Sequence, residues 1–504
     1  MSFELLFPDR NNYELPPDPS FAALLDETGL AEYLSPDAAG YFTSDPEVIR
    51  CRSELISELA GNERLLAAVD TLAKLSAEYS ETASRIRLAV QGSPMNLLVG
   101  AASAYVNFTE EASDAFREAG EIGNPALAAV ASRLGAERSS REFEELKRNL
   151  TRSRVDLLNA RSMTVGINLD GELKPVEAGV VSINSKPFLS ENLIDRLMRL
   201  DFEKGGFHCI TPLSSAESAL DYEERLRLDG AVTAAVDKLC SASLKRTVKR
   251  FLSYISARLG EYLRLGREAE FLRSACGLTA RLREIGMECS RAEVTDGEYS
   301  ITGLYDPALA MMLGGQAKER IVPNDITFDG DGRVYILTGP NGGGKTVFLR
   351  ALAASQAMLR LGMPVPAASA RMPVVDNVLT VFPRARKAGD VSGRFEEECR
   401  AAAEILDRCR PGSLVLCDEM FSSTCAEDGV RLAADVLSRL GGAGCRCVFS
   451  THFSGLGERL GGTDGVDTLH AGLDGGRRTY RILRGGAESA SDAITIAQKY
   501  GFGK

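Results

Sequence analysis

The sequence predicts an α/β domain with a parallel sheet and a phosphate-binding loop, C-terminal to a mostly α-helical region with a small β insert. Three observations carry this prediction. A glycine-rich stretch, Gly339-Pro-Asn-Gly-Gly-Gly-Lys345-Thr346, lies between an apolar strand and a helical segment. A second apolar run, Ser413-Leu-Val-Leu-Cys-Asp418-Glu419, ends in two carboxylates. Long helical patterns dominate the first 300 residues. The C-terminal part is therefore a P-loop NTPase domain.

The glycine stretch matches the phosphate-loop pattern G-x-x-x-x-G-K-[ST]. The β-branched run before it, Arg333-Val-Tyr-Ile-Leu-Thr338, is typical of a buried parallel strand. Backbone N–H groups at the start of the following helix favour an anion, Lys345 would reach the β/γ-phosphates, and the Thr346 hydroxyl would bind Mg²⁺. The expected nucleotide-binding residues are Gly339, Pro340, Asn341, Gly342, Gly343, Gly344, Lys345 and Thr346. A glycine-rich turn without a ligand is the alternative, and the flanking segments argue against it.

Two further strand ends supply the remaining candidate site residues. Asp418 would hold Mg²⁺ together with Thr346, and Glu419 would polarise the attacking water. An acidic helix cap would explain Asp418, but not its coincidence with a phosphate loop. The strand Arg446-Cys-Val-Phe-Ser450 is followed by His452, one of three histidines in the chain. His452 is expected either to sense the γ-phosphate or to be a structural histidine. ATP and Mg²⁺ are the expected cofactors.

The first 300 residues are expected to be long helices with one β interruption. Asp45 is an N-cap with Pro46 in the first turn. Alternating apolar residues around Asp170-Gly171 predict a hairpin within a β insert at about 162–188. Helices are expected at about 45–60, 63–82, 90–118, 125–160 and 216–285. The sequence analysis therefore separates two domains, 1–298 and 299–504.

The net charge of −11 is concentrated in the helical region. Residues 301–504 contain 24 Lys+Arg and 23 Asp+Glu of the 59 and 70 in the chain, which leaves 35 against 47 for residues 1–300. A broad DNA-binding surface usually has the opposite sign. Nucleic-acid contact would then depend on local patches or on a second subunit.

Two helical stretches are locally basic. In the first, Lys245, Arg246, Lys249 and Arg250 form i,i+4 pairs on one helix, and they are the candidate DNA contacts. The second consists of Arg133, Arg138, Arg141, Lys147, Arg148, Arg152, Arg154 and Arg161. The alternative for both stretches is a solvated helix face that pairs with nearby acidic helices.

The sequence carries no signal for secretion, membrane insertion or zinc binding. No apolar run of 18 residues occurs, and the first residues lack a basic segment followed by an apolar one. The 11 cysteines form no Cys-x-x-Cys pair. A reduced, cytoplasmic protein is expected.

Over about residues 299–501 these motifs resemble the MutS ATPases of DNA mismatch repair. The resemblance rests on Thr338-Gly-Pro-Asn-Gly-Gly-Gly-Lys-Thr, Val365-Pro-Ala367, Leu414-Val-Leu-Cys-Asp-Glu-Met with Thr424 and Asp428-Gly429, Phe449-Ser-Thr-His-Phe, and the tail Glu488-Ser-Ala-Ser-Asp-Ala-Ile-Thr-Ile-Ala. It implies an ABC-type ATPase domain, with residues 1–298 as a lever and clamp region.

The resemblance also implies a homodimer in which a signature segment of one subunit completes the ATP site of the other. Its counterpart here is Ser392-Gly-Arg-Phe395 with Glu398, so Ser392 and Arg394 are the trans candidates. The family's Ser-Thr-Phe is Gly393-Arg394-Phe395 in this chain, and its Gly-Arg-Gly-Thr after the catalytic Glu is Phe421-Ser-Ser-Thr424. Both differences fall at the expected dimer interface. Instead of completing the partner's site as the family's segment does, Arg394 could place its positive charge at the γ-phosphate.

The expected function is that of a short MutS homologue, without the N-terminal mismatch-recognition domain or a Smr domain. It would bind and hydrolyse ATP to open and close as a clamp on double-stranded or branched DNA in repair or recombination, without itself reading mismatches. The alternative is an ATPase that acts on ribosomes, RNA or a protein partner. A transporter ATPase is disfavoured because no Leu-Ser-Gly-Gly signature occurs.

Overall fold

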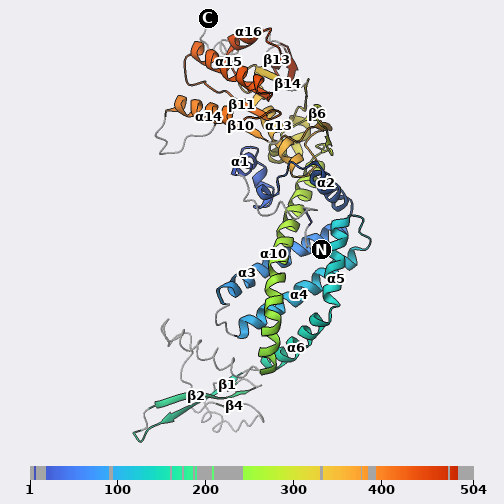
Figure 1. Cartoon of the computed structure of the whole chain (residues 1–504), viewed down its shortest axis with the longest axis vertical. Helices are drawn as coiled ribbons and strands as arrows, with labels where there is room; N and C mark the ends of the chain where they lie inside the picture. Colours follow the sequence, from blue (N-terminus) through green and yellow to red (C-terminus); the bar gives the residue numbers. More distant parts are fainter. Residues whose placement is uncertain are drawn as a thin grey trace. The chain divides into compact units, whose positions relative to one another are not determined.

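The computed structural model describes residues 5–6, 19–89, 95–158, 162–172, 175–184, 188–189, 207–208, 242–329, 333–375, 377–383, 393–474 and 477–485 (Figure 1). The chain divides into two compact units. One contains Met1–Phe3 and Asp70–Arg267, and the other contains Glu4–Val69 and Glu268–Lys504. The unit boundaries fall within helices α3 (Glu63–Ala89) and α10 (Ala242–Glu284). Residues 4–69 and 268–298 thus belong to the same compact unit as the C-terminal residues, and the predicted domain boundary at 298/299 remains a prediction.

The C-terminal unit is built on a six-stranded sheet in the order β10-β11-β12-β8-β13-β14. The strands are β8 (Val334–Thr338), β10 (Val378–Val381), β11 (Leu414–Asp418), β12 (Arg446–Ser450), β13 (Val466–Asp474) and β14 (Arg477–Arg484). Only the β13–β14 pair is antiparallel, and the other neighbours are parallel. The carboxyl ends of β8, β11 and β12 therefore meet at one edge of the sheet, which is where α/β folds build their sites.

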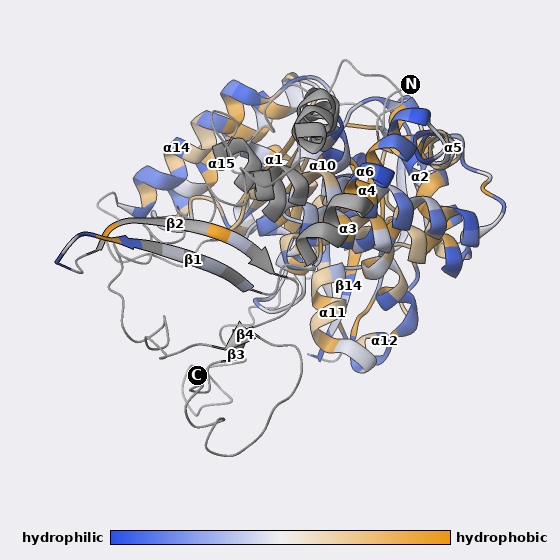
Figure 2. Cartoon of the chain, turned by 90° about the horizontal axis from the view of Figure 1, so that it is seen from below, coloured by the Kyte–Doolittle hydropathy of each residue, from blue (hydrophilic) through white to orange (hydrophobic). Residues whose placement is uncertain are grey.

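Helices cover both faces of this sheet, which explains why its central strands are apolar throughout. Helix α13 (Lys345–Arg360) follows β8 and packs on β10, β11 and β12. A hydrophobic core joins the other face to α14 (Arg394–Arg408), α15 (Ala426–Gly442) and α16 (Ser454–Leu460). Hydrophilic and hydrophobic residues mix along α14 in Figure 2, as expected for a helix with one buried face.

A second, four-stranded sheet lies in the same unit in the order β5-β9-β6-β7. Its strands are β5 (Glu293–Val294), β6 (Tyr299–Leu304), β7 (Asn324–Phe328) and β9 (Ser369–Met372). Short helices α11 (Pro307–Leu313), η4 (Gly314–Gln316) and α12 (Ala317–Arg320) connect β6 to β7. Asp306 caps α11 by accepting hydrogen bonds from the N–H groups of Ala308 and Leu309.

The N-terminal segment of this unit contains α1 (Pro19–Glu27), η2 (Leu30–Glu32), η3 (Ala38–Tyr41) and α2 (Pro46–Gly61). Asp45 accepts a hydrogen bond from the Glu47 N–H, so the predicted N-cap of α2 is confirmed. The segment packs on the C-terminal end of α13, where Arg360 is buried against the ring of Phe21 at 4.6 Å. The segment thus contributes a helix, α1, that packs on α13, the helix that follows the phosphate loop.

The other unit is mainly helical. Besides parts of α3 and α10 it contains α4 (Met95–Ala119), α5 (Pro125–Arg138) and α6 (Arg141–Leu158). Tyr105, Phe108 and Tyr262 form a stack in its core, with Phe108 and Tyr262 ring centroids 4.3 Å apart. The predicted hairpin is present as β1 (Ser162–Leu169) paired antiparallel with β2 (Pro175–Asn184), and β3 (Phe188–Leu189) pairs with β4 (Phe207–His208). The described helices include none with the length and apolarity that a membrane crossing requires.

Candidate nucleotide site

The phosphate loop connects β8 to α13 through backbone that only glycine adopts readily. Gly339, Gly342 and Gly344 have φ values of 130°, 72° and 96°. A Cβ atom at Gly339 would lie 2.8 Å from the Cβ of Ala471, and one at Gly343 would lie 2.9 Å from the carbonyl oxygen of Pro340. The predicted glycines are therefore required both by conformation and by close packing.

Lys345 begins α13 and is almost fully buried. Its Nζ donates hydrogen bonds to the carbonyl oxygens of Gly339 and Pro340, at 2.8 and 3.2 Å. These contacts hold the ammonium group over the glycine loop at the positive end of the helix dipole. Both features favour a bound anion at this point.

Thr346 and Asp418 come together as the sequence predicts. The Thr346 hydroxyl donates a hydrogen bond of 2.6 Å to Oδ2 of Asp418. The Asp418 side chain is 4% exposed, and its Oδ1 is buried without a hydrogen-bond partner. An unsatisfied buried carboxylate oxygen beside a hydroxyl fits an Mg²⁺ ion, which prefers oxygen ligands. Among the described residues, no three His, Cys, Asp or Glu side chains gather as a metal-binding cluster.

Glu419 follows β11 with a left-handed backbone, at a φ of 53°. Its N–H donates to the carbonyl oxygen of Ser450 at the end of β12, at 2.9 Å. Two residues later, buried Phe421 also has a positive φ, 64°. A non-glycine residue held in this region stores strain, which often occurs at functional sites.

A cavity of about 740 Å³ joins these groups. Its polar lining includes Asn341, Lys345, Thr346, Asp418 and Glu419, beside the glycines Gly342 and Gly344. The lining also includes the apolar or aromatic side chains of Leu309, Met312, Leu313, Ile321, Val322 and Tyr480. A cavity of this size with both polar and apolar lining suits a nucleotide.

The sequence motifs did not predict the residues that line the nucleotide cavity outside the phosphate loop and the strand end at Asp418. Tyr480 of β14 lines the cavity in a left-handed conformation, with a φ of 57°. It lies here because β13 pairs with β8 and carries β14 to the phosphate loop. No local sequence signal marks that pairing.

His452 follows β12, whose neighbours in the sheet are β11 and β8. Its exposed ring lies against Phe453, with the ring centroids 4.6 Å apart. It is not among the described residues that line the nucleotide cavity. The γ-phosphate role predicted for His452 therefore remains a prediction.

Of the two trans candidates, Ser392 lies outside the described residues, and Arg394 begins α14. The exposed Arg394 side chain donates to the Ser422 hydroxyl at 3.1 Å and pairs with Glu398 at 3.4 Å. Ser423 donates to the other oxygen of Glu398, at 2.5 Å. The start of α14 thus contacts the loop after Glu419 within the same chain.

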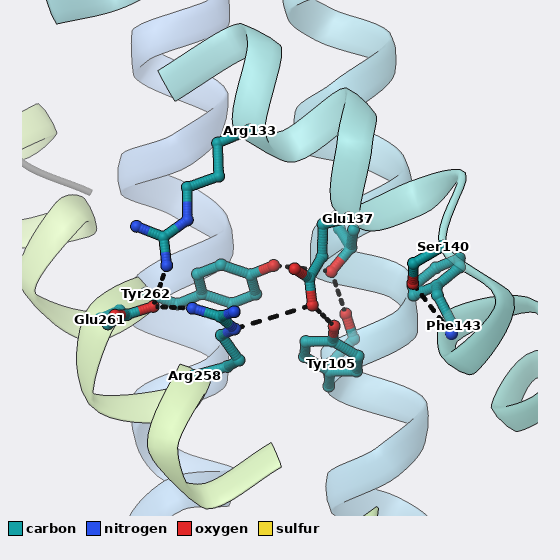
Figure 3. A network of polar contacts seen from close by, with 9 residues as sticks. Tyr105, Arg133, Glu137, Ser140, Phe143, Arg258, Glu261 and Tyr262 are labelled. Carbon is teal, nitrogen blue, oxygen red and sulfur yellow. Dashed lines mark hydrogen bonds and ion pairs between the residues drawn. The ribbon is translucent and has the colours of Figure 1, made fainter. Parts of the chain in front are cut away.

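Three residues of the second basic stretch pair with acidic side chains, while the side chains of Arg152, Arg154 and Arg161 lie outside the described part of the structure. Arg133 contacts Glu261 at 3.0 Å, within the network around Glu137 and Arg258 that Figure 3 shows. Arg138 pairs with Asp114 and lowers the pKa of that carboxyl group, and Lys147 pairs with Glu110. These contacts match the alternative interpretation, pairing with nearby acidic helices.

The first basic stretch, with Lys245, Arg246, Lys249 and Arg250, lies on the helical backbone of α10. The side chains of these residues are outside the described part of the structure. Their assignment as DNA contacts therefore remains a prediction from the sequence.

Comparison with known proteins gives a consistent result for the C-terminal unit. Residues 335–502 match MutS domain V. The chain is 32% identical over 236 residues to the DNA mismatch repair protein MutS of Desulfosudis oleivorans, covering 43% of this chain and 26% of that protein. It is 37% identical over 208 residues to the endonuclease MutS2 of an Anaeromyxobacter species, covering 40% of this chain and 25% of that protein. The matched part spans about a quarter of these relatives.

Proposed function

We propose that this chain, a member of the MutS family through its ATPase domain, MutS domain V, hydrolyses ATP to drive clamp-like opening and closing on DNA. The proposed ATP hydrolysis is supported above all by one observation: Lys345, Thr346, Asp418 and Glu419 line the same cavity. These residues lie at or after the ends of β8 and β11, two parallel strands of one sheet with β12 between them, and their types are those that phosphoryl transfer to water requires.

In this proposal the loop from Gly339 to Thr346 binds the phosphate chain. Its backbone N–H groups and the Lys345 ammonium neutralise phosphate charge, since both lie at the positive end of α13. Thr346 and Asp418 would hold Mg²⁺, which neutralises charge on the β- and γ-phosphates when bound. Glu419 orients and polarises the attacking water, and its fixed backbone keeps the carboxylate at the cavity wall. His452 would contact the γ-phosphate from the end of β12.

The DNA half of the proposal is supported by the names of the relatives, which are DNA mismatch repair proteins, and by the basic stretch at Lys245–Arg250. We propose that the substrate is double-stranded or branched DNA, in repair or recombination. We also propose that residues 1–298 act as a lever and clamp region and do not themselves read mismatches. A homodimer would bring Ser392 or Arg394 of one subunit to the ATP site of the other.

A ribosome, RNA or protein substrate is the competing possibility. The acidic balance of residues 1–300, 35 basic against 47 acidic residues, favours it over extensive DNA binding. The two possibilities differ in what stimulates ATP turnover.

The test measures ATP turnover of the full chain with Mg²⁺, alone and with paired duplex, mismatched duplex, branched DNA and ribosomes. We expect stimulation by DNA, to the same extent by paired and mismatched duplex, and loss of turnover in Lys345→Ala. Turnover that responds to ribosomes and to no DNA would refute the DNA half. Unchanged turnover in Lys345→Ala would refute the ATPase half.

A further inference from the structure

Two side chains of β14 lie against the phosphate loop from outside the motifs. Nη1 and Cζ of Arg478 are 3.1 and 3.4 Å from the position that a Cβ atom of Gly342 would occupy. Cδ1 of Tyr480 is 3.7 Å from the corresponding position at Gly344. Residues two apart in a strand share a face, so one face of β14 presents a cation and a ring to the loop.

The position of β14 is fixed by its pairing with β13 and by hydrogen bonds from neighbouring residues. Ala471 of β13 packs against Gly339 and Gly343. The Thr479 hydroxyl donates to the carbonyl oxygen of Gly472, at 2.9 Å. These contacts place β13 and β14, and with them Arg478, beside the phosphate loop.

Asn324 of β7 forms hydrogen bonds with β14 at Tyr480 and Ile482, which follow Arg478 in the strand. Its Nδ2 donates to the carbonyl oxygen of Tyr480 at 3.1 Å, and its Oδ1 accepts from the N–H of Ile482 at 2.6 Å. Both hydrogen bonds hold Tyr480 in its left-handed conformation, with a φ of 57°. Strain of this kind persists only where the surroundings enforce it, and here it turns the strand at the wall of the nucleotide cavity.

We propose that Arg478 is a phosphate-binding residue of the nucleotide site, contacting the α/β-phosphates from the side opposite Lys345. The inference rests on the proposed ATP binding. Backbone N–H groups of a phosphate loop cradle the α/β-phosphates, and Gly342 has no side chain to separate Arg478 from them. A guanidinium group binds phosphate oxygens through two parallel N–H donors, which a lysine ammonium cannot do.

This assignment differs from γ-phosphate sensing in a measurable way. A residue that contacts the α/β-phosphates strengthens ATP and ADP binding alike, whereas a γ-phosphate contact strengthens ATP binding only. Adenosine, which has no phosphate, would bind independently of Arg478.

The experiment measures equilibrium binding of fluorescent ATP and ADP analogues, with adenosine as a competitor, to the full chain. In Arg478→Ala we expect affinity for ATP and for ADP to fall by a similar factor, about tenfold, with Arg478→Lys in between. Adenosine competition should stay at the wild-type value. Arg481→Ala is the matched control, because Arg481 is another exposed cation of the same strand.

The proposal would be wrong if Arg478→Ala bound both nucleotides with wild-type affinity. It would also be wrong if Arg481→Ala lost as much affinity as Arg478→Ala, or if Arg478→Ala lost affinity for ATP only. Melting temperatures without nucleotide show whether a loss of affinity comes from unfolding, and an equal drop in adenosine binding would also contradict a phosphate contact. Failure of the wild-type protein to bind either nucleotide would instead refute the proposed function. Loss of binding in Lys345→Ala but not in Arg478→Ala would refute this inference alone.

Discussion

At the residue scale, three residues near the nucleotide site have strained backbone conformations. Glu419, Phe421 and Tyr480 are the non-glycine residues with positive φ in the described part of the chain. Each such residue costs about 1–3 kcal/mol, which the surrounding packing must offset. Glu419 and Tyr480 both line the nucleotide cavity. The contacts that enforce these conformations therefore fix this part of the cavity wall before a ligand binds, which reduces the cost of ordering it on binding.

Substitution of Glu419 separates its chemical role from this strain. In Glu419→Gln we expect ATP binding to remain and turnover to fall by about 10²–10⁴-fold, the usual contribution of a general base. Stability should change little, because the backbone conformation is the same. In Glu419→Gly turnover should fall equally, while the unfolding free energy rises by about 1 kcal/mol as the strain is relieved. Single-turnover kinetics and denaturant unfolding measure both quantities, and Glu419→Gln with wild-type turnover would contradict the role.

The site residues found from sequence are those whose partners are set by local geometry. Lys345 and Thr346 follow directly from the loop, and Asp418 meets Thr346 because both lie where strands of one parallel sheet end. Arg478, Tyr480 and Asn324 were not predictable in this way. Their positions depend on the pairing of β13 with β8 and on contacts between residues more than 150 positions apart, such as Asn324 with Tyr480.

At the element scale, α13 connects the nucleotide site to the N-terminal segment. Its first residues bind the phosphate loop, and its last residue, Arg360, is 4% exposed. Arg360 donates from Nε to the carbonyl oxygen of Thr43 at 3.1 Å and lies over the ring of Phe21. The helical patterns predicted this element, but not its N-terminal partners, because packing between distant segments leaves no periodic signal.

Removal of the Arg360 side chain should destabilise this unit. Arg360→Ala loses a charged hydrogen bond and a cation–π contact, so we expect the unfolding free energy to fall by about 2–4 kcal/mol. Arg350→Ala is the control on the same helix, where the side chain is exposed, and should stay within about 0.5 kcal/mol of wild type. Urea unfolding of the two variants measures the difference. Equal stability would show that the segment 19–43 does not anchor α13.

At the scale of the whole molecule, the two basic stretches of the helical unit have different expected roles. In the second stretch, Arg133, Arg138 and Lys147 pair with acidic side chains, which reduces the charge that these three residues present to a ligand. The first, on α10, has four cations within six residues, and Glu261 is the only acid between 244 and 267. If the acidic chain binds DNA, the first stretch is where counterion release is expected.

Pairs of charge removals on the two stretches test this directly. Lys245→Ala with Lys249→Ala should weaken DNA binding and lower the slope of log affinity against log salt by about 2, since each phosphate contact contributes about 0.9. Arg141→Ala with Arg148→Ala removes the same charge from exposed positions of α6 and should leave the slope unchanged. Fluorescence anisotropy with a labelled duplex at several salt concentrations gives both slopes, and melting temperatures check folding. Equal slopes for the two double variants would mean that DNA affinity depends only on the total charge of the protein. The assignment of the α10 residues as DNA contacts would then be wrong.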